Sequence, residues 1–437
     1  METLESIKSA TPFWGKGKLF LKCIIIFLMA MLLWIPTNFI MEVVKEREGR
    51  QKEAIADISS KWAGRQAVTG PLLMIPYKLL LVDEKGSQSW QRQNAYFMPD
   101  MLDVSSKVFP EKRKRGIYEV AVYKTDIMLT GRFNNIPWQK LEIAADQILW
   151  NEAVLLFKVQ DQLKGINEDL FVKWNDSRFV FTTQATGQTP LEDAFFTSVP
   201  ITQDNAASGS TFSIHFSLNG SEQLLFSALA RENKIEMSSV WPDPGFTGIK
   251  LPDSRQVTDS GFTAKWKYMN RAMPQVWKNT FYNFSAAQFG ADLLIPVDSY
   301  NKTERSVKYA LLCIMLTFAA FFLVETIYKR PLHLVQYGLA GLALVLFYTL
   351  LLSISEYTGF NLAYLIAGSA TIGLVGWYVG SILKSSKLAL FISFVLAVVY
   401  SYIFSIIQLQ DYALLMGSIG LFVALGIIMY FSRKLEW

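Results

Sequence analysis

Residues 308–360 read KYALLCIMLTFAAFFLVETIYKRPLHLVQYGLAGLALVLFYTLLLSISEYTGF, two apolar segments separated by a basic turn at Lys329–His333. Each segment has about 20 residues, and a helix of that length crosses the ~30 Å hydrocarbon core of a bilayer at 1.5 Å per residue. The stretch therefore predicts a transmembrane helical hairpin. A long polar region, residues 41–306, precedes it, and three further apolar segments follow it.

The composition fits a chain that lies partly in a membrane and partly in water. Of its 437 residues, 51% are hydrophobic and 18% are charged. Residues 41–306 contain 31 Lys/Arg and 31 Asp/Glu, so the formal net charge of +5 comes from the rest of the chain, with 11 basic and 6 acidic residues. The positive excess therefore reflects membrane topology, and nucleic acid is not an expected partner.

Six transmembrane helices are predicted from the apolar segments. The first, residues 19–40, follows a polar leader at residues 1–18, and it is expected to be an uncleaved signal anchor because its apolar run is longer than the core of a signal peptide. The other five predicted spans are residues 307–327, 334–353, 361–383, 388–408 and 412–431, and residues 432–437 form a tail.

The short loops between these spans differ in charge. The basic residues lie at alternate ends of the spans: Lys329 and Arg330, Lys384 and Lys387, Arg433 and Lys434. The intervening loops around Glu356 and Asp411 contain no Lys or Arg. Because basic short loops remain in the cytoplasm, both termini are expected there, and residues 41–306 are expected on the outer face of the membrane.

Glycines are concentrated in the predicted membrane helices, where Gly376 and Gly380 give one helix a smooth face. Helices in lipid associate through close backbone packing, which small residues permit. These helices are therefore expected to pack on one another, or on a second copy of the chain in a homo-oligomer. Helix breaks that line a transport site are the alternative interpretation.

The polar region changes pattern along its length. Residues 41–62 are charged and free of proline, with apolar residues at helical spacing, which predicts a helical stalk. In residues 212–218 every second side chain is large and apolar, and Asn219-Gly220 follows as a favoured hairpin turn. Other segments alternate in the same way, so a mostly antiparallel, sandwich-like β domain is predicted.

The densest run of charge is Glu111–Arg115, just before a strand that is expected to begin at Ile117. One interpretation is a site for anionic lipid headgroups or polysaccharide phosphate on the outer face of the membrane. The favoured interpretation is a solvated loop, since most charge runs are solvated surfaces.

The sequence contains no recognisable catalytic, cofactor or metal-binding motif. The two histidines, His215 and His333, fall in different predicted compartments, whereas a zinc site needs three or four convergent ligands. Both cysteines, Cys23 and Cys313, fall in apolar spans, so the β domain has no disulfide. Nucleophile motifs and phosphate-binding glycine loops are also missing. We therefore expect a protein without enzymatic activity, cofactor or metal.

Two carboxylates near span ends, Glu325 and Glu356, are the candidate functional residues of the membrane part. Glu325 stands four residues before Lys329, which is the favourable order for a helical ion pair, so a structural pair is the leading interpretation. Because His333 follows closely, a cytoplasmic proton relay through Glu325 is the alternative.

Several motifs taken together resemble the CreD family of bacterial inner-membrane proteins over nearly the whole chain. The resemblance is specific at Trp241-Pro242 and at Ser260-Gly261-Phe262, and it is densest over residues 308–360. It implies a multi-pass inner-membrane protein with a large periplasmic domain, linked to envelope integrity, envelope stress and a two-component sensor system. It supplies no catalytic residues.

Two classes of function remain open at this point. In the favoured class, the protein is a non-enzymatic envelope factor whose periplasmic domain binds an envelope polymer or a partner protein. In the second class, it is a transporter or lipid-handling protein with an outer receptor domain. A sealed, glycine-packed bundle would favour the first class, and a groove continuous with the membrane would favour the second. Membrane lipid is an expected partner in both.

Overall fold

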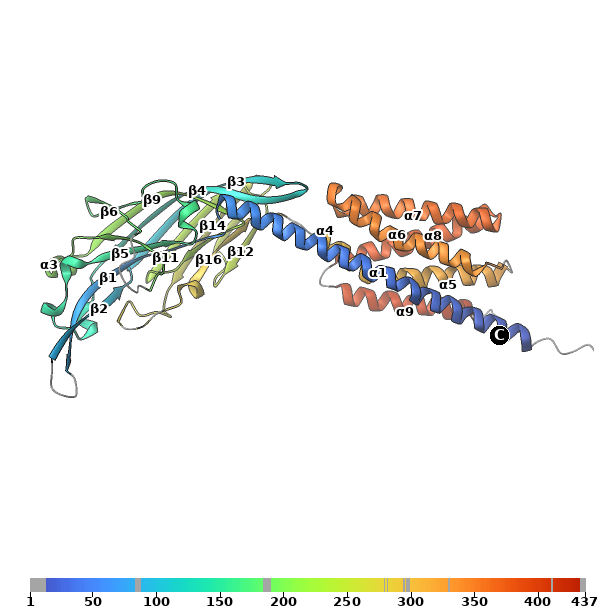
Figure 1. The fold of residues 1–437 in the computed structure, drawn as a ribbon, viewed down its shortest axis with the longest axis horizontal. Coiled ribbons are helices and arrows are strands. Elements are labelled where there is room, and N and C mark those ends of the chain that lie inside the picture. The colour runs from blue at the N-terminus through green and yellow to red at the C-terminus, as the bar shows by residue number, and fades with distance from the viewer. Residues whose placement is uncertain are drawn as a thin grey trace, which may run out of the picture. The chain divides into compact units, whose positions relative to one another are not determined.

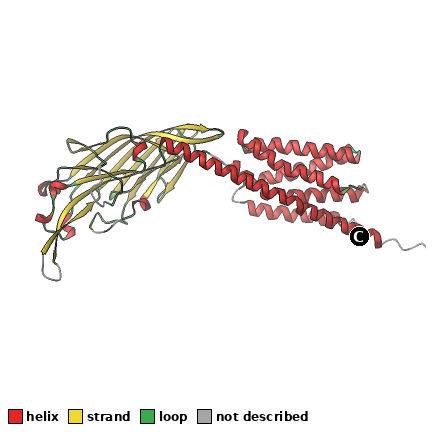
Figure 2. Cartoon of the chain, viewed as in Figure 1, coloured by secondary structure: helices red, strands yellow, loops and turns green. Residues whose placement is uncertain are grey.

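The computed structural model describes residues 13–82, 88–183, 190–278, 280, 282–293, 295, 299–328, 331–409 and 412–432. The chain forms two compact units, Met1–Lys52 with Val297–Trp437, and Glu53–Pro296. The first unit is helical and the second is built mainly of strands (Figures 1 and 2). The boundary between the units falls inside one long helix, α1 (Phe13–Trp62), which contains both the predicted anchor and the predicted stalk.

The helical unit is made of long apolar helices. After α1 its helices are α4 (Ser299–Lys308), α5 (Ala310–Tyr328), α6 (Leu334–Thr358), α7 (Phe360–Leu383), α8 (Ser386–Gln408) and α9 (Ala413–Ser432). Five helices of the described chain, α1 and α5 to α8, are long and apolar enough to cross a membrane. In α9 the described apolar part, Leu415–Ile427, is shorter. The coarse prediction of a multi-pass helical bundle is therefore confirmed, and five of the six predicted spans meet the length criterion.

Aromatic side chains fill the space between these helices. The Tyr337 ring of α6 packs edge-on against Phe318 and Phe321 of α5, with ring centroids 5.6 and 5.7 Å apart. Phe347 of α6 packs against Tyr400 of α8 at 4.6 Å. In lipid this packing replaces the hydrophobic drive that water provides elsewhere, so it holds α5, α6 and α8 together.

The strand unit contains two eight-stranded sheets. In the first sheet the order is β12-β16-β10-β1-β2-β15, with β5 paired to β1 and β8 paired to β5. Its strands are β1 (Gln66–Val82), β2 (Gln88–Phe97), β5 (Val154–Val159), β8 (Phe195–Ser198), β10 (Gln223–Ser227), β12 (Pro244–Gly248), β15 (Val276–Lys278) and β16 (Gln288–Leu293). The parallel pairing of β1 with β10 makes this sheet mixed.

The second sheet has the order β13-β14-β11-β3-β4-β9-β6-β7. Its strands are β3 (Met101–Arg115), β4 (Tyr118–Phe133), β6 (Phe171–Trp174), β7 (Ser177–Val180), β9 (Ser210–Ser221), β11 (Glu232–Ser239), β13 (Ser254–Thr258) and β14 (Gly261–Met269). Here β11 pairs with β3 in parallel, and the other described pairings are antiparallel. The short helices α2 (Gln162–Gly165) and α3 (Gln203–Ser208) belong to the connections.

The two sheets contribute side chains to one hydrophobic core. Phe157 of β5 packs edge-on against Phe216 of β9 at 5.5 Å, and Trp266 of β14 packs against Phe289 of β16 at 6.0 Å. Burial of each such ring contributes roughly 2 kcal/mol, so the domain is stabilised without a disulfide. Along β9 the apolar side chains are buried and His215 is exposed, as the alternating sequence predicted.

The predicted turn at Asn219-Gly220 is wrong, because both residues lie inside β9 opposite β4. The chain turns instead at Glu222, which has a φ of 61°. Glycine is needed at position 220 for space, since a Cβ there would lie 2.3 Å from the Tyr123 hydroxyl. That hydroxyl donates to the carbonyl of Gln223 at 2.7 Å, and burial raises the pKa of Tyr123 well above its ordinary value.

The loop predicted for Glu111–Arg115 is also wrong. These residues form the end of β3 and pair with β4, where Arg115 lies opposite Tyr118. The turn between the two strands consists of Gly116, with a φ of 61°, and Ile117. A two-residue turn with a positive φ matches the twist of paired strands, so the charged run continues the ladder and does not leave it.

Candidate functional site

The first candidate site surrounds the carboxylate of Glu325 on α5. The Lys22 ammonium of α1 forms an ion pair with it, and the Tyr337 hydroxyl of α6 donates to its second oxygen at 2.9 Å. The same ammonium donates to the carbonyl of Leu332 at 2.7 Å. The side chains of Lys22 and Glu325 are only 22% and 12% exposed. Three helices therefore meet at one partly buried ion pair.

The partner expected from the sequence was Lys329, which lies outside the described residues. His333 lies at the N-terminus of α6. Its ring Nδ1 accepts from the Val335 backbone N–H at 3.3 Å, and its own N–H donates to Gln336 at 3.0 Å. This arrangement caps the N-terminus of α6, where the first backbone N–H groups need partners. Among the described interactions, none joins His333 to Glu325.

The second candidate site surrounds Glu356 near the end of α6. The Tyr300 hydroxyl of α4 donates to the Glu356 carboxylate at 3.0 Å. Arg47 of α1 lies 3.8 Å from the same oxygen. The site repeats the pattern of the first, in which a carboxylate meets a cation from α1 and a tyrosine hydroxyl from another helix.

The two sites bind α1 to the other helices at two separate levels. Lys22 and Arg47 are 25 residues apart in the same helix, which corresponds to roughly 37 Å at 1.5 Å per residue. This separation exceeds the ~30 Å thickness of a hydrocarbon core, so both ion pairs can lie near the two membrane surfaces, where burying charge costs less. The arrangement fixes the position of α1 along the bundle.

Gly376 and Gly380 lie on the face of α7 that packs against α8. A Cβ at Gly376 would lie 2.2 Å from the Ser393 hydroxyl, and one at Gly380 would lie 3.3 Å from Ala389. Together with neighbouring small side chains they line a shallow groove of about 470 Å³. The glycines therefore set the α7–α8 distance within one chain.

Trp241 and Pro242 follow β11 in the strand unit. Trp241 is buried in the core, whereas Pro242 is exposed. The Lys112 ammonium lies 5.7 Å from the Trp241 ring, a cation–π distance. The buried indole contacts Lys112 near the end of β3, which indicates a structural role for this motif.

Several charges of the Glu111–Arg115 run form ion pairs with neighbours in the same unit. Arg115 pairs with Asp57 of α1, and Lys114 pairs with Glu119 at 2.7 Å. The hydrogen bond from Lys114 lowers the pKa of the Glu119 carboxyl. Arg113 lies over the Trp62 ring at 5.1 Å. The run thus joins the β3–β4 hairpin to the end of α1.

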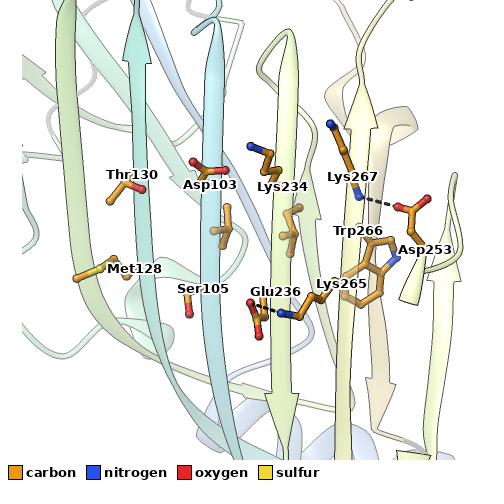
Figure 3. Close-up of a pocket in the computed structure, with 12 residues that line it drawn as sticks. Asp103, Ser105, Met128, Thr130, Lys234, Glu236, Asp253, Lys265, Trp266 and Lys267 are labelled. Carbon is orange, nitrogen blue, oxygen red and sulfur yellow. Dashed lines mark hydrogen bonds and ion pairs between the residues drawn. The ribbon is translucent and has the colours of Figure 1, made fainter. Parts of the chain in front are cut away.

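The third candidate site is a groove on the polar face of the second sheet (Figure 3). Its volume is about 420 Å³, and β3, β4, β11 and β14 supply most of its walls. Because the strand register places Lys234 opposite Asp103 and Asp103 opposite Thr130, polar side chains form rows across the strands. Met128 adds an exposed apolar surface. We call this the sheet groove.

The sheet groove is charged but nearly balanced. Lys265 pairs with Glu236 at 3.1 Å, and the Asp253 carboxylate accepts from the Lys267 backbone N–H at 2.7 Å. The hydrogen bond from the Lys250 ammonium is the main cause that lowers the pKa of Asp253, and the Lys267 N–H group is the second. The carboxylate is therefore ionised at neutral pH. A surface of ammonium, carboxylate and hydroxyl groups can hydrogen-bond a polar ligand, and its balanced charge favours an uncharged or zwitterionic one.

In the part of the chain that the structure describes, no three His, Cys, Asp or Glu side chains converge to hold a metal ion. Sequence reasoning selected Glu325 and Glu356 but missed Lys22, Arg47 and the tyrosines. In the sequence, these residues are marked only as polar groups near the ends of apolar spans. The sheet groove had no sequence signal, because it depends on strand register.

Comparison with known proteins identifies close relatives. A family model described as "Inner membrane protein CreD" matches residues 18–437. The protein of the same description from Escherichia coli (strain K12) is 30% identical over 432 residues, covering 97% of this chain and 94% of that protein. A crystal structure of a protein from Parabacteroides distasonis covers 65% of this chain and 59% of its own, at 12% identity and a TM-score of 0.19, too low to support an argument.

Proposed function

The chain belongs to the CreD family of inner membrane proteins, and from this premise we propose that it maintains cell-envelope integrity without catalysing a reaction. In this proposal the helical unit anchors the protein in the inner membrane. The strand unit faces the periplasm, binds an envelope component and so contributes to the response to envelope stress. The observation that carries the proposal is the sheet groove, an open surface of the strand unit lined by three lysines, three carboxylates, two hydroxyls and apolar side chains.

The chemistry of the groove suggests what it binds. Its rows of hydroxyl, ammonium and carboxylate groups stand beside apolar surface from Met128 and Trp266. Such rows offer many weak hydrogen bonds at regular strand spacing, about 4.8 Å, which suits an extended polymer better than a compact small molecule. An envelope polymer or an extended segment of a partner protein has these properties.

A photo-crosslinking amino acid at Met128 should capture this component in intact cells. Met128 lines the groove and is 46% exposed. The matched control is Leu163 on α2, which is 90% exposed in the same unit but does not line the groove. We expect a discrete adduct, identified by mass spectrometry, from Met128 and none from Leu163. Equal adducts at both positions, or an adduct only at Leu163, would contradict the groove as the binding site.

The proposed orientation follows from the loop charges. Lys384 and Lys387 lie at the same ends of the spans as the Glu325 site, and the basic residues of short loops are retained in the cytoplasm. The opposite end, with Glu356, then faces the periplasm. Since α1 continues past Arg47 into the strand unit, that unit would lie on the periplasmic side.

Cysteine labelling tests this orientation. His215 is exposed on β9, so in a chain with Cys23→Ser and Cys313→Ser the substitution His215→Cys presents a single surface thiol. We expect a membrane-impermeant maleimide to label it in cells whose outer membrane alone is permeabilised. Labelling that requires disruption of the inner membrane would place the strand unit in the cytoplasm and end the proposed role.

A further inference from the structure

Three buried hydroxyl groups in the helical unit have no hydrogen-bond partner among the described residues. They belong to Ser306 of α4, Tyr348 of α6 and Tyr400 of α8. All three side chains are at least nine-tenths buried. A hydroxyl transferred from water to an apolar environment without a hydrogen bond is strongly destabilised, and the penalty is not relieved by lipid. Three such groups in one bundle require an explanation.

Two of the three hydroxyls, those of Tyr348 and Tyr400, lie beside Cys313. The Cys313 thiol of α5 is fully buried. Sulfur is a weak acceptor, so the thiol does not replace a true partner. A third tyrosine, Tyr364 of α7, donates to the Tyr400 backbone carbonyl at 2.9 Å. Four helices thus bring polar groups together in the interior of the bundle.

Ser306 and Tyr348 lie within about two helical turns of the Glu356 site. The hydrogen bond from Tyr300 to Glu356 aligns the start of α4 with the end of α6. Ser306 is six residues beyond Tyr300, and Tyr348 is eight residues before Glu356, so both lie roughly 9 to 12 Å from that site along their helices. On the other side of Cys313, the hydroxyl of the buried Thr317 already donates to the Cys313 carbonyl at 2.7 Å, and the buried side chains beyond it include the apolar Phe318, Phe321 and Leu344.

We propose that the bundle contains a hydrated inlet, which opens at the Glu356 site, ends beside Cys313, and binds water through Ser306, Tyr348 and Tyr400. A buried water makes two to four hydrogen bonds to such otherwise unsatisfied groups. Small monovalent cations that travel in hydrated spaces would enter with the water, and the apolar side chains beyond Cys313 close the inlet. This inference goes beyond the proposed envelope function, which requires no water inside the bundle.

Cys313 is a natural probe of the inlet. In the full-length chain with Cys23→Ser, we expect Ag⁺, a cation small enough to follow water, to bind Cys313 in the folded protein in nitrate buffer. The bound silver is measured by elemental analysis, with thiol titration after unfolding as the total. A dry core would leave Cys313 unreactive until the protein unfolds, and that result would overturn the proposal.

The matched control places a thiol in the apolar region. Leu344 is as fully buried as Cys313 and lies one helical turn from Tyr348, away from Glu356. In the chain with Cys23→Ser, Cys313→Ser and Leu344→Cys, the introduced thiol should react with Ag⁺ at least about tenfold more slowly, since no buried hydroxyl there binds water. Equal rates at both positions would show general loosening of the bundle and would contradict a defined inlet.

Removal of the hydroxyls gives an independent readout. If Tyr348 and Tyr400 bind water, Tyr348→Phe with Tyr400→Phe should lower the thermal unfolding midpoint and slow the silver reaction of Cys313. If the hydroxyls are in a dry core, the same change removes two unsatisfied groups and should raise the midpoint. A raised midpoint would therefore overturn the inference even if the silver reaction were ambiguous.

Discussion

Replacing Glu325 by Gln is expected to lower the free energy of unfolding of the helical unit by about 3 kcal/mol, the lower end of the range for breaking a buried ion pair. The lower end applies because Lys22 and Glu325 retain 22% and 12% exposure. The substitution leaves the partly buried Lys22 ammonium without a counter-charge, and its hydrogen bond to the Leu332 carbonyl remains. The measurement is the unfolding midpoint of the purified protein in detergent during titration with a denaturing detergent.

A double-mutant cycle identifies the partner of Glu325. Lys22→Met alone should destabilise the unit, and Lys22→Met with Glu325→Gln should cost less than the sum of the two, because neither charge remains unpaired. Lys329→Met should show no such coupling. The reverse pattern, with coupling to Lys329 and none to Lys22, would restore the i,i+4 pair expected from the sequence.

An exposed ion pair calibrates this measurement. Glu48 and Lys52 form an i,i+4 pair on α1, with side chains 30% and 73% exposed. Glu48→Gln should cost less than about 1 kcal/mol, as exposed pairs do. If Glu325→Gln costs no more than Glu48→Gln, the Glu325 site does not hold α1 in place.

Gly376→Leu is expected to disrupt the packing of α7 on α8. A Cβ at this position would lie 2.2 Å from the Ser393 hydroxyl and 3.6 Å from the Ser393 Cβ, so the hydroxyl must shift, and the larger Leu side chain is expected to press on α8. Overpacking of this kind costs about 1 to 3 kcal/mol, and more when backbones are in close contact. The expected result is a lower unfolding midpoint and a larger aggregated fraction in size-exclusion chromatography.

Gly373→Leu is the matched control on the same helix. Nothing lies within 4 Å of a Cβ at Gly373, and the residue lines the open part of the same groove. The additional side chain can therefore point into the groove, and the unfolding midpoint should remain close to that of the unmodified protein. Wild-type behaviour of Gly376→Leu, or equal damage from both substitutions, would refute the specific α7–α8 contact.

Much of the fold was predictable because hydropathy and side-chain alternation over a few residues determine its helices and strands. Apolar runs of about 20 residues can satisfy their backbone hydrogen bonds in lipid only as helices, and α5 to α8 occur where these runs occur. Strict alternation in β9 similarly predicted which side chains face the core. The predicted turn at Asn219-Gly220 failed because that dipeptide is favoured in turns only on average, and here the Tyr123 hydroxyl occupies the space beside Gly220.

The candidate sites were less predictable. Glu325 was selected from its place at a span end, but its partner Lys22 is 303 residues away in the chain. A lysine four residues further along the chain, Lys329, was the better guess from spacing alone. The side chains of the charged run Glu111–Arg115 are exposed, as expected, but the run forms a strand paired with β4 and not a loop.

By itself, the order of residues determined that this chain has a helical membrane part and a strand-rich part, and that acidic groups lie at the ends of its spans. Hydropathy and side-chain period act over a few residues, so they can be read without a fold. Only the tertiary structure decided which cation meets each carboxylate, which strands form the sheet groove and which hydroxyls surround Cys313. Those contacts join residues from separate helices or strands, and their geometry depends on packing that no local pattern encodes.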